Sequence, residues 1–68
     1  MRIYGKVIEY DGYVGTIIDS KGIKYLLICE NIDGELDNGD FVSFIPELYT
    51  TVEIQQWIAR FVIKENDN

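Results

Sequence analysis

The sequence predicts an all-β fold in which five short antiparallel strands close into one small barrel. Three observations support this prediction. Runs rich in β-branched and aromatic residues alternate with turns that contain glycine, and no stretch shows a convincing helical repeat. The length of 68 residues suffices for a single domain with a modest core. Closure into a barrel leaves such strands without open edges.

The first half of the chain contains three predicted strands. Residues 3–10 form the first strand, and the dipeptide Asp11-Gly12 after it is a strong turn signal. Residues 13–18 form the second strand, and Gly22 is expected to take the positive φ angle of the short loop that follows. Residues 23–29 form the third strand.

The next stretch of the chain is less regular. Residues 30–40 are predicted to form a polar loop, which only the apolar side chains of Ile32 and Leu36 can anchor. Residues 41–45 form the fourth strand, and Pro46 is expected to end it because proline removes a hydrogen-bond donor. A connection around residues 47–50 follows.

The fifth predicted strand begins in a segment that allows two interpretations. Residues 52–58 fit one or two turns of an amphipathic helix, but the β-branched residues on both sides favour a strand. Alternation places Trp57, Ala59, Phe61 and Ile63 on one face and Ile58, Arg60, Val62 and Lys64 on the other. Trp57 is expected in the core. We predict one domain over residues 1–64 and a polar tail over residues 65–68.

Charge is unevenly distributed along the chain. Twelve acidic and six basic residues give a formal net charge of −6, and no Lys or Arg occurs between Tyr25 and Ala59. The carboxylates of that stretch are Glu30, Asp33, Glu35, Asp37, Asp40, Glu47 and Glu53. Such carboxylates either keep a small protein in solution or form an acidic surface for a basic partner. The sequence leaves both interpretations open.

Residues that commonly carry catalysis or bind cofactors are scarce. One cysteine, Cys29, and no histidine exclude an internal disulfide and the usual zinc, haem and iron–sulfur ligand sets. Asp33, Glu35 and Asp37 resemble a calcium loop, but the glycine and the last ligand do not fall at the required positions. We therefore expect no cofactor, no metal and no enzymatic activity. Short apolar runs and a single cysteine predict a cytoplasmic protein without membrane contact.

Several short motifs occur in the order and spacing of a known family. Gly5 to Asp11, Gly15-Thr16-Ile17, residues 25–32, residues 39–44 and Ala59-Arg60-Phe61 resemble the cold-shock domain over about residues 3–64. The first turn is shorter here than in the family. The resemblance implies a five-stranded OB-type barrel whose outward aromatic side chains stack on the bases of single-stranded RNA or DNA.

Most positions that this family uses for stacking are not aromatic here. At these positions the chain has Glu9, Val14, Thr16, Leu26, Ile28 and Cys29, and only Tyr10 keeps a ring. Stacking on one aromatic side chain is worth roughly 1–3 kcal/mol per base, whereas a micromolar affinity requires only about 8 kcal/mol in total. The losses therefore disfavour the nucleic-acid binding that is usual for the family.

The altered positions predict a different kind of surface. Strand alternation turns Tyr25 and Leu27 inward and Leu26 and Ile28 outward, where they form an aliphatic patch. An apolar centre with a polar and tyrosine rim has the composition of a protein contact. The predicted surface, which we call the candidate face, consists of Glu9, Tyr10, Tyr13, Val14, Thr16, Leu26, Ile28 and Glu30. The alternative is that residues 31–38 or 47–53 cover this patch and make it core.

Three functional hypotheses follow. The leading one is a binding module that contacts a protein through the candidate face, in one version as a nucleic-acid mimic in the basic groove of a DNA- or RNA-handling protein. The second is a weak binder of single-stranded nucleic acid that uses Tyr4, Tyr10, Tyr13, Tyr49, Lys6, Lys24, Arg60 and Lys64. The third is a homodimer that associates through the same aliphatic patch.

Overall fold

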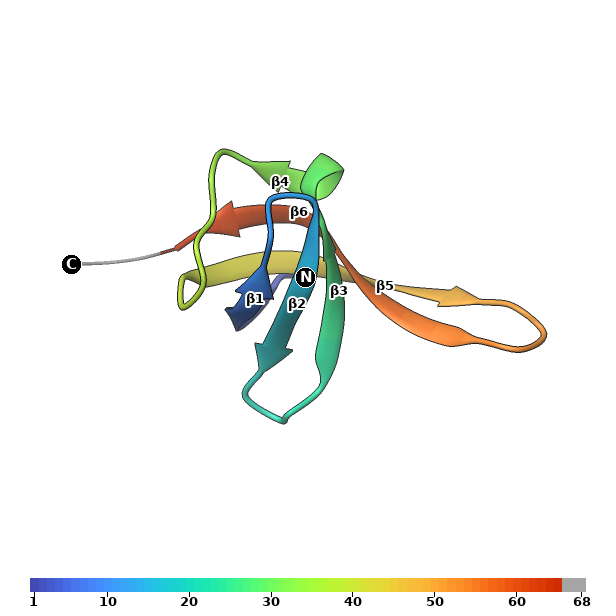
Figure 1. Ribbon diagram of the computed structural model, residues 1–68. Helices are drawn as coiled ribbons and strands as arrows, with labels where there is room; N and C mark the ends of the chain where they lie inside the picture. Colours follow the sequence, from blue (N-terminus) through green and yellow to red (C-terminus); the bar gives the residue numbers. More distant parts are fainter. Residues whose placement is uncertain (66–68) are drawn as a thin grey trace.

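The computed structural model describes residues 1–65, most of which lie in strands (Figure 1). The elements in chain order are β1 (Ile3–Tyr10), β2 (Val14–Asp19), β3 (Lys24–Ile28), the 3₁₀ turn η1 (Cys29–Asn31), β4 (Ile32–Asp33), β5 (Phe41–Thr50) and β6 (Gln55–Lys64). The strand predicted near the C-terminus is confirmed from Gln55 onward. None of the described segments forms a helix with the length and hydropathy that crossing a bilayer requires.

Five of these strands close into a barrel. β1 pairs antiparallel with β2 on one side and with β5 on the other, while β2 continues to β3 and β5 to β6. The barrel closes where β3 meets β6 in parallel, at Leu26 and Ile58. β4 adds a short parallel pairing to β6. This arrangement confirms the predicted fold class, a small all-β barrel of the OB type.

The barrel encloses a small apolar core. Its buried side chains are those of Val7, Ile17, Tyr25, Leu27, Leu36, Val42, Phe44, Ala59 and Val62. The rings of Tyr25 and Phe44 meet edge to face, with their centroids 4.7 Å apart. Tyr25 and Leu27 point inward, as alternation predicts, and Leu36 anchors the loop after β4 as expected.

The hydroxyl group of Tyr25 ties the turn after β2 to the core. It donates a hydrogen bond to Asp19 Oδ2 at 2.8 Å, and Asp19 Oδ1 accepts the backbone N–H groups of Lys21 and Ile23 at 2.9 Å. Burial and the hydrogen bond to Asp19 raise the pKa of Tyr25 to about 12. Burial alone would raise the pKa of the Asp19 carboxyl, but the hydrogen bonds that it accepts outweigh burial and lower this pKa.

We expect the free energy of unfolding to fall as the pH rises from about 10 to about 12. Tyr25 ionises near pH 10 in the unfolded chain but keeps its proton to about pH 12 in the folded chain, so its contribution is complete below pH 10 and is lost above it. The lowered pKa of Asp19 acts in the opposite direction. Its contribution is present above about pH 4 and is lost as the pH falls further.

Urea unfolding at a series of pH values, followed by circular dichroism, measures both effects. Tyr25→Phe should make the alkaline decline of the unfolding free energy shallower, because this variant has no hydroxyl group to ionise at position 25. An alkaline decline of unchanged steepness in Tyr25→Phe would contradict the assignment.

Strand β3 ends one residue earlier than predicted, at Ile28. Residues Cys29–Asn31 form η1 and β4 follows at once, so the predicted loop over residues 30–40 contains part of a 3₁₀ turn and a two-residue strand. The backbone N–H of Cys29 donates to the carbonyl oxygen of Tyr13 at 2.9 Å. This bond directs the chain away from β3 toward β6, where Ile32 pairs with Val62.

The prediction that Pro46 ends the fourth strand is wrong. β5 continues through Pro46 to Thr50, and together with β6 it forms one long hairpin. The pairing of β1 with β5 stops at Phe44, so β5 has a neighbour on one side only beyond this point. A strand with an open edge tolerates proline. Residues 47–57, which we call the arm, extend from the barrel as a two-stranded ribbon (Figure 1).

A β-bulge interrupts β6 opposite Phe44. Ser43 pairs with Ile63 and Ile45 with Arg60, so that two residues of β6 lie opposite the single residue Phe44. One of these two, Phe61, has a φ angle of 53°. Residues other than glycine rarely adopt this left-handed conformation. Because of the extra residue, the alternation of inward and outward side chains along β6 is out of phase on the two sides of the bulge.

Because of this bulge, the alternation predicted for the last strand is wrong. Ala59 and Val62 are both buried, although they were expected on opposite faces, and Phe61 is 70% exposed. The core position predicted for Trp57 is also wrong. Trp57 is 40% exposed and lies on the arm, where its ring centroid is 6.2 Å from that of Tyr25.

Side-chain hydrogen bonds fasten both ends of the described chain to β5. Arg2 Nε donates to Ser43 Oγ at 2.8 Å, and Ser43 Oγ donates to Glu65 Oε2 at 2.7 Å. The backbone N–H of Glu65 also donates to the carbonyl oxygen of Phe41 at 2.7 Å. Glu65 is the first residue of the predicted tail, and the rest of that tail, residues 66–68, lies outside the described residues.

Candidate functional site

The centre of the candidate face is the outer side of the hairpin formed by β2 and β3. Val14 pairs with Ile28 and Thr16 with Leu26, so these four side chains lie together. Val14 is 51% exposed and the other three are half-buried. None of the four is buried, which argues against the alternative that residues 31–38 or 47–53 turn this patch into core.

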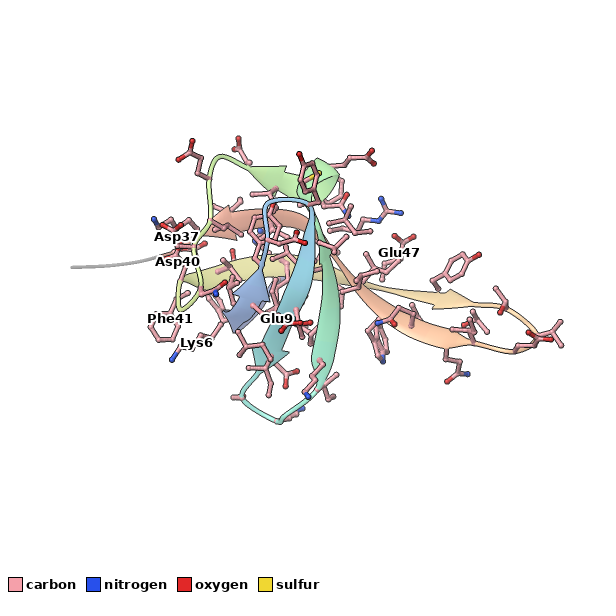
Figure 2. All side chains as sticks on the ribbon, in the orientation of Figure 1. Lys6, Glu9, Asp37, Asp40, Phe41 and Glu47 are labelled. Carbon is pink, nitrogen blue, oxygen red and sulfur yellow. The ribbon has the colours of Figure 1, made fainter. Side chains whose placement is uncertain are left out.

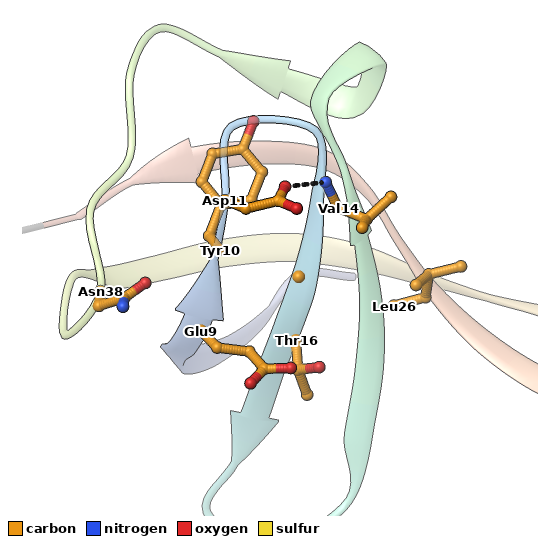
Figure 3. Close-up of a pocket in the computed structure, with 8 residues that line it drawn as sticks. Glu9, Tyr10, Asp11, Val14, Thr16, Leu26 and Asn38 are labelled. Carbon is orange, nitrogen blue, oxygen red and sulfur yellow. Dashed lines mark hydrogen bonds between the residues drawn. The ribbon is translucent and has the colours of Figure 1, made fainter.

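Part of the candidate face is hollowed into an open depression of about 500 Å³ (Figure 3). It is lined by Glu9, Tyr10, Asp11, Val14, Gly15, Thr16, Leu26 and Asn38. Five of these belong to the predicted candidate face: Glu9, Tyr10, Val14, Thr16 and Leu26. The fold therefore brings these predicted residues from three strands to one site.

A bulge in β1 and a glycine in β2 form one wall of the depression. Val7 pairs with Ile17 but Glu9 pairs with Thr16, so β1 carries one extra residue at this point. The two strands approach so closely that a Cβ atom on Gly15 would lie 2.1 Å from the backbone oxygen of Glu9. Only glycine fits at this position without moving the backbone of β1.

The other three predicted residues lie outside the depression and extend the candidate face. Tyr13 is exposed in the turn after Asp11, and Glu30 is exposed in η1. Ile28 lies at the end of β3, next to Val14. The hydrogen bond from the backbone of Cys29 to that of Tyr13 holds the turn and η1 together. These residues therefore form a margin on one side of the depression.

The electrostatics of the depression are set by the carboxylates of Glu9 and Asp11, because its lining includes no Lys or Arg among residues 1–65. Asp11 Oδ1 accepts the backbone N–H of Tyr13 at 2.8 Å and that of Val14 at 2.9 Å, and Figure 3 shows the second of these bonds. The hydrogen bond from Val14 lowers the pKa of the Asp11 carboxyl group most strongly, and the bond from Tyr13 lowers it further. Asp11 is therefore ionised at neutral pH.

Tyr10, which also lines the depression, adds an uncharged hydroxyl group to its polar side chains. Burial raises the pKa of the Tyr10 hydroxyl group, and electrostatic interactions with Cys29 and Asp11 raise it further. The depression thus combines negative charge, a hydroxyl group and the aliphatic side chains of Val14 and Leu26. This combination suits a basic side chain with a long apolar stem.

Three residues of the depression were not predicted as part of the site: Asp11, Gly15 and Asn38. The sequence marks Asp11 only as a turn residue, although its position next to Tyr10 was an available signal. Asn38 carries no local signal, because long-range pairing brings its loop to β1. The backbone N–H of Gly39 donates to the carbonyl oxygen of Val7 at 2.7 Å. The backbone N–H of Val7 in turn donates to the backbone carbonyl oxygen of Asp40 at 2.9 Å.

The carboxylate of Asp40, in the acidic loop before β5, is engaged in contacts within the chain. Within residues 1–65, no group of three or more His, Cys, Asp or Glu side chains could hold a metal ion. Asp37 and Asp40 lie close together (Figure 2), but Asp40 Oδ2 accepts the backbone N–H of Asp37 at 2.8 Å and lies 3.4 Å from Lys64 Nζ. These contacts hold the loop in place.

No protein-family model and no curated protein matches the chain. Membership of the cold-shock family therefore stays a prediction. The structure places aliphatic and polar side chains, and no aromatic ring, at the outward positions of β2 and β3. Function has to be inferred from the geometry of the site itself.

Proposed function

We propose that the chain is a non-enzymatic binding module that contacts a basic protein surface through the candidate face. The observation that carries this proposal is the depression, whose carboxylates, Glu9 and Asp11, have no cation beside them in its lining. An arginine or lysine of the partner would pack its stem against Val14 and Leu26 and direct its charged end to these carboxylates. The exposed ring of Tyr13 offers an anchor at the margin.

A more specific version is that the chain imitates nucleic acid. The net charge of −6 and the exposed carboxylates near η1, Glu30, Asp33 and Glu35, support it. The partner would then be a DNA- or RNA-handling protein whose groove is basic, and nucleic acid would compete with the chain for that groove. This version adds the identity of the groove to the proposed function and extends the contact from the candidate face to the carboxylates of Asp33 and Glu35.

Single-stranded nucleic acid is the weaker candidate ligand. Arg60 and Lys64, two of the four cations predicted to meet phosphates, form ion pairs with carboxylates of the chain itself. Tyr4 lines a separate groove and Tyr49 lies on the arm, so the tyrosines do not follow one path across the surface. Stacking of successive bases requires such a path.

Charge reversal at Glu9 is expected to weaken the binding of an arginine-rich peptide about tenfold. The substitution Glu9→Lys places a cation in the depression, where it repels the guanidinium groups of the peptide. Isothermal titration at physiological ionic strength measures the dissociation constant. The matched control is Glu53→Lys, which changes the net charge equally at the exposed tip of the arm.

The control variant should change the dissociation constant less than about threefold, because Glu53 is remote from the depression and salt screens its charge. Equal losses in the two variants would show that the peptide responds to net charge alone. That result would contradict the proposed site.

A further inference from the structure

A row of cations borders the candidate face on the outer side of the same three strands. Lys6 pairs with Ile18, and Ile18 pairs with Lys24, so these side chains are neighbours across β1, β2 and β3. They point outward, because a neighbour of each along its own strand is buried in the barrel. We call Lys6 and Lys24, with Ile18 between them, the lysine row.

The next outward row of these strands begins the acidic part of the surface. Glu9 pairs with Thr16 and Thr16 with Leu26. Leu26 is two residues from the lysine row along β3, which corresponds to about 7 Å. Asp11 and Glu30 lie further from the lysine row, because they follow the ends of β1 and β3. The outer side of the sheet therefore has a cationic end and an anionic end.

The charges of the lysine row are not neutralised by ion pairs. Within residues 1–65, neither Lys6 nor Lys24 forms one, whereas Arg60 and Lys64 do. Lys6 Nζ lies 5.8 Å from the ring centroid of Phe41, and an aromatic ring carries no net charge. Both lysines are exposed. They can therefore meet a carboxylate from outside the chain.

Two carboxylates near this end of the sheet have cations of their own. Asp19, at the end of β2, accepts backbone N–H groups of the following turn, and the charge of Lys21 acts on it. Glu65 lines a groove together with Lys6, but it accepts a hydrogen bond from Ser43, to which Arg2 also donates. These local partners leave the positive charge of the lysine row uncompensated.

Charge complementarity selects a partner with two poles. A surface that is basic throughout would be attracted to Glu9 and Asp11 but repelled by the lysine row nearby. A nucleic acid would be attracted to the lysine row and repelled by the carboxylates. A protein segment with a cation at one end and a carboxylate at the other is attracted at both ends.

We propose that the partner of the candidate face is a protein surface on which a basic group and a carboxylate lie about 7–14 Å apart, with the carboxylate against the lysine row. In an extended segment this spacing separates a residue from the second or the fourth one after it. The inference rests on the proposed function and adds a second contact to it. Two contacts of opposite sign fix the orientation in which the partner docks.

Two peptides of identical composition test this order of charges. The bipolar peptide carries arginines at one end and glutamates at the other, with valine and threonine between them, and its isomer carries both residue types equally at both ends. Isothermal titration should give a dissociation constant at least about threefold lower for the bipolar peptide. Equal dissociation constants, with the arginine-rich peptide still bound, overturn this inference alone. Failure of the arginine-rich peptide to bind overturns the proposed function as well.

Charge reversal in the lysine row locates the second pole. Lys6→Glu and Lys24→Glu should each weaken binding of the bipolar peptide about tenfold. Neither should weaken binding of the arginine-rich peptide, because an added carboxylate attracts arginine. The matched control is Lys21→Glu, which changes the net charge equally in the turn outside the row and should change the dissociation constant less than about threefold.

Three results of these titrations would overturn the inference. The first is an equal loss in Lys6→Glu, Lys24→Glu and Lys21→Glu, which would show a response to net charge alone. The second is unchanged binding of the bipolar peptide by both variants of the lysine row, with circular dichroism spectra that match the unmodified chain. The third is saturable binding of oligo-dT that Lys6→Glu abolishes, which would assign the lysine row to nucleic acid.

Discussion

Replacing Gly15 by alanine is expected to lower the free energy of unfolding by about 3 kcal/mol or more. The added Cβ atom would lie 2.1 Å from the backbone oxygen of Glu9 and 2.8 Å from Tyr10 Cα. Both are backbone atoms of the bulged strand, which cannot retreat without breaking its pairing with β2. A chain of this size has a total stability of only about 3–10 kcal/mol, so much of the population should unfold.

Urea unfolding followed by circular dichroism measures this loss, and Thr16→Ala serves as the control. Thr16 is the neighbour of Gly15 in β2 and its side chain points to the outer side, so its truncation should cost less than about 1 kcal/mol. If Gly15→Ala unfolded at the same urea concentration as the unmodified chain, the close approach of β1 and β2 would be refuted.

Truncation of Phe44 to alanine is expected to cost about 3–5 kcal/mol. Phe44 is fully buried, and its ring meets that of Tyr25 with a centroid distance of 4.7 Å. The ring also fills the space beside Gly5, where an added Cβ atom would lie 3.3 Å from it. Its removal leaves a cavity at the centre of a small core, which the surrounding strands cannot collapse to fill.

The matched control is Phe41→Ala, which removes the same ring from the same strand. Phe41 is 57% exposed, and Lys6 Nζ lies 5.8 Å from the centroid of its ring. The exposed ring should contribute less than about 1 kcal/mol. Thermal unfolding of the two variants under identical conditions compares the losses. Equal losses would contradict the placement of Phe44 in the core and of Phe41 on the surface.

The part of the fold that local sequence determines was predicted well. The strands up to Ile28, the turns at Gly12 and Gly22, and the inward positions of Tyr25 and Leu27 follow from alternation and from positive φ angles. Each of these features depends on residues that are close in sequence. The all-β fold class could therefore be predicted without any information on tertiary contacts.

Long-range pairing determines the parts that were not predicted. The prediction that the strand ends at Pro46 failed because the sequence does not show where β1 stops pairing with β5. That pairing ends at Phe44, so β5 has an open edge at Pro46. The alternation of the last strand failed because one extra residue, Phe61, is accommodated in a bulge opposite Phe44. A bulge reverses the pattern of every residue on one side of it.

The candidate site was predicted in part for the same reason. Glu9, Val14 and Leu26 reach the depression through strand pairing that the spacing of the motifs implied. Asn38 reaches it through backbone hydrogen bonds between β1 and a loop remote in sequence, which leave no periodic signal. Strand patterns therefore predicted most of the residues that line the depression, but the full lining required the tertiary structure.

The most direct test of whether the candidate face binds protein rather than nucleic acid is an amide-shift titration of the isotope-labelled chain at low salt. The ligands are an arginine-rich peptide, oligo-dT and mixed-sequence RNA. We predict saturable shifts at Glu9, Val14 and Leu26 with the peptide, and no saturable shifts with either nucleic acid. Saturable micromolar binding of oligo-dT or RNA that perturbs Tyr10, Leu26 and Ile28 would contradict the proposed function.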